Sequence, residues 1–208
     1  MSTKMKLLPS AIDSENLKQK ILKSFVTADN NCDAKNALKM VFIDTPPGSM
    51  VAVSDDKNLL MLEFIDSKHL DAEMKHLIQM QSKSIVQDVN ELTAPLKSIK
   101  TELDAYFSGK LTEFHTPYYI HPDETEFQRS VWDAIHKIEY GKTATYSELA
   151  NAVGKPKSSR AVANACGRNP ITIIIPCHRV LPASGRTGGY RCGAEKKDWL
   201  LDHEENFM

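Results

Sequence analysis

The sequence lacks the features that mark membrane and secreted proteins. No stretch of its 208 residues approaches the roughly 20 consecutive apolar residues of a membrane-spanning helix. Residues 1–9 offer only the apolar pair Leu7-Leu8, whereas a secretory signal needs a longer apolar run. The four cysteines form no C-x-x-C pair, which argues against a zinc ribbon and against a disulfide framework. We therefore expect an intracellular protein, cytoplasmic or nuclear, with reduced thiols and no membrane association.

Arginine is missing from the first 124 residues, and this absence reveals an uneven charge distribution. All six arginines follow residue 124, although the net charge of the whole chain is only −1. Residues 142–191 hold eight basic residues and a single acidic one, Glu148. Such a local positive excess is expected of a nucleic-acid-binding surface. A solvated basic face without a partner is the alternative.

The composition is that of a soluble globular protein, with 41% hydrophobic and 25% charged residues, and the length suits one ordinary domain or two small ones. Residues 110–123 show no sustained period and contain two prolines, as expected of a connection between domains. We expect an N-terminal extension or helix, an α/β N-terminal domain, a linker and a C-terminal DNA-binding domain, with the respective bounds 1–36, 37–115, 116–124 and 125–208.

In the N-terminal part, apolar spacing predicts a helix within residues 17–25 and two more over 70–78 and 96–107. Short β-branched and apolar runs predict strands over 40–43, 49–53 and 59–65. The fold class predicted for this part is α/β, a small antiparallel sheet covered by helices.

In the C-terminal part, two capping boxes predict helix starts. Thr125 with Gln128 precedes one apolar stripe, and Thr145 with Glu148 opens a short helix over 146–153 that Gly154 can end. A third helix over about 158–166 follows a tight turn, which is the arrangement of a helix-turn-helix DNA reader. Two packed helices occur in many other folds, but the basic charge of this region favours DNA.

Residues 171–180, ITIIIPCHRV, combine a β-branched run with a proline, a cysteine, a histidine and an arginine. The run predicts a buried strand that ends at Pro176 and places Cys177 at its end. Neighbouring groups such as His178 and Arg179 favour the thiolate, the nucleophilic form of cysteine. The alternative is that Cys177 is a small hydrophobic residue at the end of a core strand.

The motif Pro176-Cys177-His178-Arg179-Val180, preceded by Asn169-Pro170 and Arg160-Ala161-Val162, resembles the O6-alkylguanine-DNA alkyltransferase family. The resemblance spans about residues 125–204 and includes Gly189-Tyr190 and the segment 199–204, while over 37–108 it is looser. It implies a ribonuclease H-like N-terminal domain and a mostly helical C-terminal domain with a winged-helix-like helix-turn-helix. The implied activity is DNA repair by single-turnover transfer of an alkyl group from O6-alkylguanine, and also from O4-alkylthymine, to a cysteine of the protein after base flipping.

The resemblance also assigns roles to residues. Cys177 would be the acceptor, His178 would deprotonate it through a water, Glu204 would orient His178, and Tyr146 would donate a hydrogen bond to the departing base. Arg160 would enter the base stack and Asn169 would be a hinge. The implied DNA-binding set is Arg160, Ala161, Asn169, Thr145, Ser147, Lys157, Ser159, Ala165 and Arg168. The implied substrate pocket comprises Val180, Tyr190, Arg191 and Cys192.

We expect a monomer that acts on double-stranded DNA carrying alkylated bases and uses no cofactor. Some relatives hold zinc through cysteines and histidines in the N-terminal domain, but here Cys32 is the only cysteine in that part, so no metal is expected. Cys166 and Arg191-Cys192 depart from the common pattern near the pocket, so the size of the accepted alkyl group stays open.

Two rival functions stay open. A non-catalytic protein that binds alkylated lesions would share the fold but needs no cysteine. A cysteine hydrolase would use Cys177 and His178 repeatedly and would leave the basic helix-turn-helix without a role.

Overall fold

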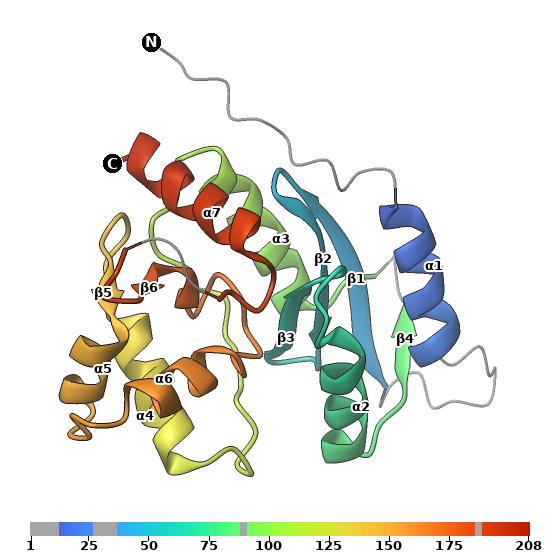
Figure 1. The fold of residues 1–208 in the computed structure, drawn as a ribbon. Coiled ribbons are helices and arrows are strands. Elements are labelled where there is room, and N and C mark those ends of the chain that lie inside the picture. Colours follow the sequence, from blue (N-terminus) through green and yellow to red (C-terminus); the bar gives the residue numbers. More distant parts are fainter. Residues whose placement is uncertain (1–12, 27–36, 88–90, 186–188) are drawn as a thin grey trace. The chain divides into compact units, whose positions relative to one another are not determined.

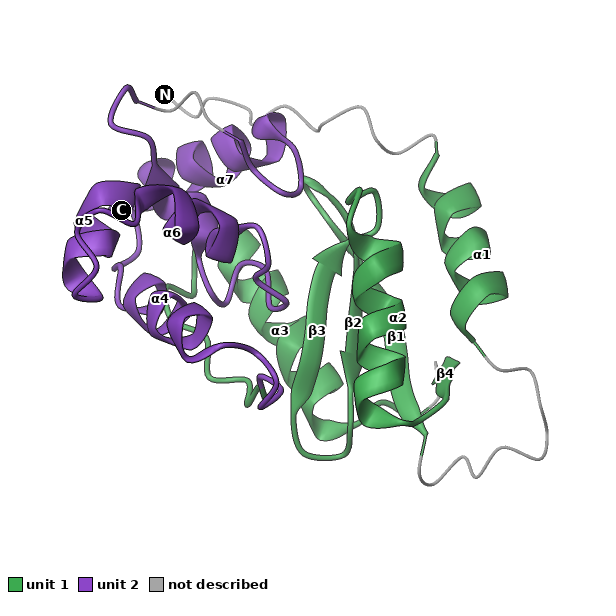
Figure 2. Ribbon diagram, turned by 60° about the horizontal axis from the view of Figure 1, so that its bottom comes forward, with its two compact units in different colours: residues 1–119 green, residues 120–208 purple. Residues whose placement is uncertain are grey.

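The computed structural model describes residues 13–26, 37–87, 91–185 and 189–208. It divides into two compact units, residues 1–119 and residues 120–208 (Figure 2). The division falls inside the expected linker, after Tyr119. The Leu59 N–H donates to the Pro117 carbonyl at 2.8 Å, and the Tyr119 N–H donates to the Leu59 carbonyl at 2.9 Å. These two bonds tie the first part of that segment to a strand of the first unit.

The first unit is built on a four-stranded sheet (Figure 1). Its elements are α1 (Ser14–Phe25), β1 (Leu38–Thr45), β2 (Gly48–Ser54), β3 (Leu59–Phe64), α2 (Leu70–Gln81), β4 (Ile85–Gln87) and α3 (Ala94–Phe107). The strand order is β3-β2-β1-β4. β1, β2 and β3 pair antiparallel as predicted, but β4 pairs parallel to β1, so the sheet is mixed. The sequence analysis missed β4 because three residues are too few to show an alternating pattern.

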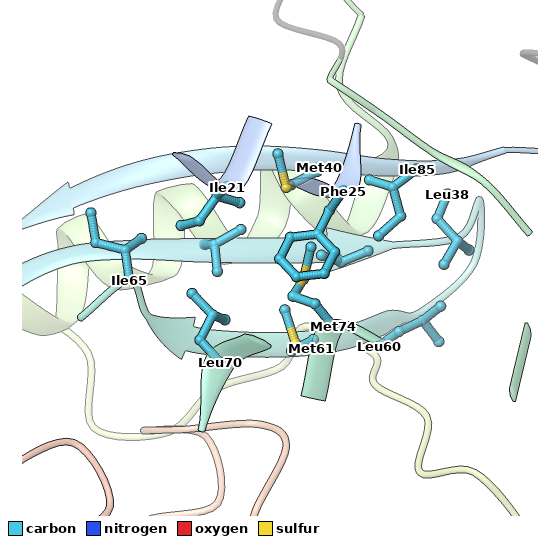
Figure 3. Close-up of a cluster of buried hydrophobic side chains, with 12 residues drawn as sticks. Ile21, Phe25, Leu38, Met40, Leu60, Met61, Ile65, Leu70, Met74 and Ile85 are labelled. Atoms are coloured by element: carbon cyan, nitrogen blue, oxygen red, sulfur yellow. The ribbon is translucent and has the colours of Figure 1, made fainter. Parts of the chain in front are cut away.

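The hydrophobic core of this unit explains the predicted helices. Ile21 and Phe25 of α1 and Leu70 and Met74 of α2 pack with Met40 and other inward-facing strand residues in one buried cluster (Figure 3). α3 packs on β1 and β2 from the opposite face of the sheet (Figures 1 and 2). The unit is therefore an α/β layer structure with both faces of the sheet covered.

The second unit is mostly helical, as predicted. Its helices are α4 (Glu126–His136), α5 (Tyr146–Ala152), α6 (Ser159–Cys166) and α7 (Ala194–Asn206), and its only described strands are the two-residue β5 (Ala144–Thr145) and β6 (Val180–Leu181). Both predicted capping boxes are present: the Thr125 hydroxyl accepts from the Gln128 N–H, and the Thr145 hydroxyl accepts from the Glu148 N–H. These bonds satisfy backbone donors that a helix start otherwise leaves unpaired.

Helices α5 and α6 form the predicted helix-turn-helix and pack together on α4. Gly154 has a φ of +70° in the turn between them, a conformation that glycine adopts without a side-chain clash. The Trp132 indole N–H of α4 donates to the Ala165 carbonyl of α6 at 2.9 Å. Val162 is fully buried. One side of α6 is thus fixed in the core, and the other side stays available to a partner.

The predicted strand over residues 171–175 is wrong. These residues are buried, but they form a tight loop in which the Ile175 N–H donates to the Ile171 carbonyl at 3.0 Å and Ile173 has a φ of +76°. A short apolar run predicts burial better than it predicts a strand. A β-branched residue at positive φ is strained by about 1–3 kcal/mol. The loop leads directly into a 3₁₀ helix, Cys177–Arg179.

Candidate active site

The loop before the cysteine is held by the buried side chain of Asn169. Its Oδ1 accepts from the Ile171 N–H at 2.9 Å, and its Nδ2 donates to the Ile175 carbonyl at 2.7 Å and to the Cys177 Sγ at 3.2 Å. Asn169 is fully buried. Its predicted roles as a hinge and among the DNA-binding residues stay predictions.

Cys177 and His178 occupy successive positions of the 3₁₀ helix. Cys177 is 4% exposed and His178 is completely buried. The His178 Nε2 lies 2.8 Å from the Glu204 Oε1, while its Nδ1 is buried and has no hydrogen-bond partner among the described residues. Because a carboxylate only accepts, the proton of a neutral imidazole lies on Nε2, which leaves Nδ1 as the basic atom.

Glu204 of α7 is surrounded by donors. The Arg179 guanidinium donates from Nε to the Oε2 at 2.9 Å and from a terminal nitrogen to the Oε1 at 2.9 Å. The Gly141 N–H donates to the Oε2 at 3.0 Å. Burial alone raises the pKa of Glu204, but the hydrogen bonds from His178 and Arg179 and the positive charge of Arg179 hold that pKa well below its usual range. The carboxylate is therefore ionised at neutral pH.

The imidazole of His178 is kept neutral by its surroundings. Burial lowers the pKa of His178, and the positive charges of Arg179 and Lys197 lower it further, against the raising effect of Glu204. The geometry agrees with a lowered pKa of His178, because Arg179 already neutralises the carboxylate that His178 contacts. A neutral histidine is the form that can accept a proton from a thiol.

Lys197 is a buried charged residue of this site that the sequence analysis missed. Its ammonium donates to the Val180 carbonyl at 2.7 Å, and its side chain is 1% exposed. Burial lowers its pKa, and the neighbouring thiols of Cys177 and Cys166 act in the opposite direction. Lys197 precedes Glu204 by seven residues, two helical turns, so both side chains lie on one face of α7. That spacing was readable in the sequence.

A pocket of about 410 Å³ opens onto the cysteine. Its described lining consists of Tyr146, Ala163, Asn164, Cys166, Gly167, Cys177, Pro182, Gly189, Tyr190 and Arg191. Tyr190 and Arg191 were predicted there, whereas Val180 and Cys192 are buried and absent from this described lining. Arg191 is anchored to the end of α6, because one terminal nitrogen donates to the Gly167 carbonyl at 3.2 Å.

Two groups in the pocket wall stay protonated at neutral pH. Burial raises the pKa of the half-buried Tyr146 to about 12, and Cys166 and Cys177 add to the rise. Burial also raises the pKa of Cys166, and the neighbouring Cys177 adds to this rise. Tyr146 is therefore a hydrogen-bond donor, and Cys166 is a thiol that competes poorly as a nucleophile.

The predicted DNA-contacting residues fall into two groups. Arg160, Ala161, Lys157, Arg168 and Ser147 are exposed, and Thr145 and Ser159 are partly exposed. The Ser147 and Ser159 hydroxyls lie 3.2 Å apart and connect the starts of α5 and α6. Ala165, in contrast, is 2% exposed, and its carbonyl accepts from the Trp132 indole N–H, so its predicted contact with DNA stays a prediction.

Within the described residues, no cluster of three or more histidine, cysteine, aspartate or glutamate side chains could hold a metal ion. Cys32, which the sequence analysis considered in this respect, lies outside those residues. None of the described helices is both long and apolar enough to cross a membrane.

Two family models match this chain. The ribonuclease-like domain of 6-O-methylguanine DNA methyltransferase matches residues 38–119, and the DNA-binding domain of the same family matches residues 126–206. The two matched ranges correspond to the two units of the structure.

Relatives and solved structures agree with this result. The chain is 40% identical over 164 residues to a methylated-DNA--protein-cysteine methyltransferase of Methanosarcina barkeri, covering 79% of this chain and 95% of the relative. It is 38% identical to a probable enzyme of that name from Acanthamoeba polyphaga mimivirus, covering 81% and 97%. The crystal structure of Mycobacterium tuberculosis OGT in complex with DNA matches with a TM-score of 0.69 and 33% identity, covering 81% and 94%. The chain belongs to the 6-O-methylguanine DNA methyltransferase family.

Proposed function

We propose that Cys177 is the residue that accepts the alkyl group when this protein repairs O6-alkylguanine in double-stranded DNA. The observation that carries this proposal is the placement of the Cys177 thiol at a 410 Å³ pocket, with the amide of Asn169 donating to its sulfur at 3.2 Å. A donor at that position stabilises a thiolate more than a thiol, because a charged acceptor makes the stronger hydrogen bond. O4-alkylthymine is a second substrate to test.

Activation of the thiol begins at His178. The Cys177 proton passes through a water to the free Nδ1 of His178, and the Nε2–H of the resulting imidazolium stays on Glu204. The ionised carboxylate stabilises the positive charge that forms on the ring. Asn169 and the neighbouring ammonium of Lys197 stabilise the negative charge left on sulfur.

The transfer itself forms one bond and breaks one. The Cys177 sulfur supplies an electron pair to the alkyl carbon, a C–S bond forms, and the bond between that carbon and guanine O6 breaks. The electron pair of the broken bond stays on guanine, where the Tyr146 hydroxyl donates a hydrogen bond to the developing charge. Tyr146 is suited to this role because its raised pKa keeps the hydroxyl protonated at neutral pH.

The product explains why each molecule acts once. The alkyl carbon of the thioether has no good leaving group, so the alkyl group stays on the sulfur. The base must also leave the duplex before a thiol that is 4% exposed can reach it. The exposed basic residues of α6 and its flanks, Lys157, Arg160 and Arg168, are suited to bind the DNA backbone. We further propose that the protein is an intracellular monomer.

Intact mass spectrometry after mixing with an O6-methylguanine duplex tests the proposal. We expect a gain of one methyl group per protein, located on the peptide that contains Cys177, and no second gain with excess substrate. Cys177→Ser should bind the duplex but gain no methyl group. Binding without a mass change in the wild type would identify a non-catalytic lesion binder. Repeated release of methylated product would identify a hydrolase.

A further inference from the structure

Arg179 lies directly after His178 in the chain, and no step of the proposed alkyl transfer is assigned to it. Its side chain is 7% exposed and makes more hydrogen bonds to Glu204 than His178 does. A third nitrogen donates to the Ile138 carbonyl at 2.6 Å, and the guanidinium lies 5.7 Å from the centre of the Tyr140 ring. These contacts fix the guanidinium in one place beside the carboxylate.

Both oxygens of Glu204 accept hydrogen bonds from Arg179, and each also accepts from one other residue. The Oε2 accepts from Arg179 and from the Gly141 N–H, and the Oε1 accepts from Arg179 and from the His178 ring nitrogen. Gly141 has a φ of +69°, a backbone conformation that suits glycine and brings its N–H to the carboxylate. His178 is therefore one of several donors to a carboxylate whose charge Arg179 already balances.

The pairing of Glu204 with Arg179 affects whether the His178 ring is protonated. A buried histidine beside an unbalanced carboxylate becomes an imidazolium, because the opposite charge favours the protonated ring. Beside a carboxylate that is already paired with a guanidinium, the ring gains a hydrogen bond but little net stabilisation of a positive charge. The ring then stays neutral and donates its single proton from Nε2 to Glu204.

We propose that Arg179 is a positioning residue that holds His178 in the neutral tautomer with the proton on Nε2 by neutralising the charge of Glu204. The inference rests on the proposed role of His178 as the base for Cys177 and adds the residue that keeps this base ready. In this role Arg179 acts directly on neither the sulfur nor the alkyl group. It acts through the carboxylate.

Several ionisable groups besides Arg179 surround His178 and affect its protonation. Glu204 and Lys197 approach from α7, Arg179 and Cys177 flank His178 in the 3₁₀ helix, and Tyr140 lies beside Arg179 and Glu204. The two basic groups oppose protonation of the ring, and Glu204 favours it. Lys197 and its contact with the Val180 carbonyl are retained when Arg179 is replaced, so replacement isolates the contribution of the guanidinium.

The first measurement is the ¹⁵N spectrum of full-length protein labelled at histidine, recorded over a range of pH. We expect His178 of the wild type to be neutral at pH 7, with the proton on Nε2. In Arg179→Met the ring should remain protonated to higher pH, because Glu204 loses its counter-ion. Arg179→Lys keeps the positive charge but has fewer hydrogen-bond donors. The pH at which its His178 ring loses the proton should lie between those of the wild type and Arg179→Met.

The second measurement is the rate of Cys177 alkylation by iodoacetamide as a function of pH, which needs no DNA. The rise of this rate with pH follows deprotonation of His178 and should move to higher pH in Arg179→Met. A displacement of about one pH unit corresponds to a rate about tenfold lower on the acidic side of the rise. The two proteins should react at similar rates at high pH, where His178 is neutral in both. A purely structural role of Arg179 would slow the reaction at every pH.

Arg129 supplies a matched control. It is a partly buried arginine of α4 whose side chain donates to the carbonyls of Ile120, His121 and Glu124 and to no carboxylate in the described set of hydrogen bonds. Arg129→Met should leave both the His178 spectrum and the pH profile in place.

An imidazolium in the wild type at pH 7, or a neutral ring with the proton on Nδ1, would overturn the proposal. The proposal would also be overturned if the alkylation rate of Arg179→Met rose with pH at the same midpoint as that of the wild type. If Arg179→Met does not fold, the wild-type tautomer and the Arg179→Lys profile decide. Methyl transfer from O6-methylguanine DNA is measured in parallel. Its failure with a neutral Nε2-protonated His178 would contradict the proposed function and leave the role of Arg179 intact.

Discussion

The side chain of Asn169 connects the turn after α6 to the sulfur of Cys177, 3.2 Å away. The same amide group bonds to the Ile175 carbonyl, and its oxygen accepts from the Ile171 N–H. One side chain thus fixes both the shape of the loop and the position of the thiol. The strained Ile173 lies within this loop, so the surrounding bonds have to hold it there.

Asn169→Ala should lower both stability and reactivity. It leaves the Ile171 N–H and the Ile175 carbonyl without their buried partner, at a cost of about 1–3 kcal/mol for each group. It also removes the donor to the Cys177 sulfur, so alkylation of Cys177 by iodoacetamide at pH 7 should slow by about tenfold or more, the effect of losing one charge-assisted hydrogen bond. Urea unfolding and the alkylation rate measure the two effects.

Val162→Ala separates the two effects of the Asn169 variant. Val162 is a fully buried residue of α6 outside the loop of residues 171–175, and its truncation destabilises the same unit by leaving a cavity. We expect Val162→Ala to lower stability and to keep the alkylation rate of the folded protein. Equal slowing in both variants would show that reactivity follows general stability and that the Asn169 donor has no specific effect.

Glu204 should make the stability of the protein depend on pH. The pKa of Glu204 is lowered in the folded protein relative to an ordinary value of 4.5. Its contribution to the free energy of unfolding is therefore fully present above about pH 4.5 and is lost as the pH falls further. His178, whose pKa is also lowered from 6.5, adds a loss that begins below about pH 6.5, because the unfolded chain binds a proton that the folded chain does not. The free energy of unfolding should therefore fall in two stages on acidification.

Glu204→Gln should remove the lower stage. Loss of the carboxylate leaves Arg179 buried without its counter-ion, and breaking such a pair costs about 3–5 kcal/mol at neutral pH. The wild-type and variant free energies should converge as the pH is lowered toward 3. Urea unfolding at several pH values measures this, with the exposed neighbour Glu205→Gln as the control. Parallel curves for the wild type and Glu204→Gln would contradict the assignment of the lower stage to Glu204.

Local signals in the sequence predicted much of the fold. The capping boxes at Thr125 and Thr145 place the starts of α4 and α5 because each depends on residues three positions apart. The predicted strands β1, β2 and β3 and the helices that cover them also match the structure, because their apolar periods extend over several residues.

The errors arise where tertiary contacts decide the structure. The run of residues 171–175 favours a strand by composition, but bonds to the Asn169 side chain fold it into a loop. Lys197 appears in the sequence as an ordinary helix lysine, and its burial beside Cys177 follows only from how α7 packs on the 3₁₀ helix. The pairing of Arg179 with Glu204 joins residues 25 positions apart. The seven-residue spacing of Lys197 and Glu204 places them on one face of α7, but no local pattern shows what that face packs against.

Cys166 should influence the size of the alkyl group that the pocket accepts. It lines the pocket together with the small residues Ala163 and Gly167 of the same segment. Cys166→Met places a longer side chain there, and one added methylene in a fitted pocket is worth about 1–3 kcal/mol. We expect transfer from O6-benzylguanine to slow by about tenfold or more, and transfer from O6-methylguanine to slow much less.

Cys192→Met is the matched control for this prediction. Cys192 is also a buried thiol, but it is not among the described residues that line the pocket. Its replacement should cost stability and keep the wild-type ratio of benzyl to methyl transfer. The role of Cys166 would be disproved by a ratio that stays unchanged in Cys166→Met, or that changes equally in both variants.

Arg160 should matter more for a paired lesion than for an unpaired one. It is exposed in the first turn of α6, with Lys157 nearby in the chain. If its guanidinium fills the space left by the extruded guanine, its loss removes the group that offsets unstacking, a cost of a few kcal/mol for a paired base and less for an unpaired base. A phosphate contact would instead weaken binding to all substrates alike.

Three substrates distinguish these two roles of Arg160: a lesion in a stable duplex, the same lesion opposite a gap, and the free modified base. The transfer rate of Arg160→Ala should fall most for the duplex, be reduced less for the gap, and change little for the free base. Arg160→Lys should restore little, because an ammonium cannot stack as a planar guanidinium does. All rates are compared at one salt concentration, since every DNA affinity here depends on it.

Lys157→Ala, which removes a nearby exposed charge, should slow transfer from both DNA substrates to a similar extent. Uniform slowing in Arg160→Ala, largely restored by lysine, would reduce Arg160 to a phosphate contact.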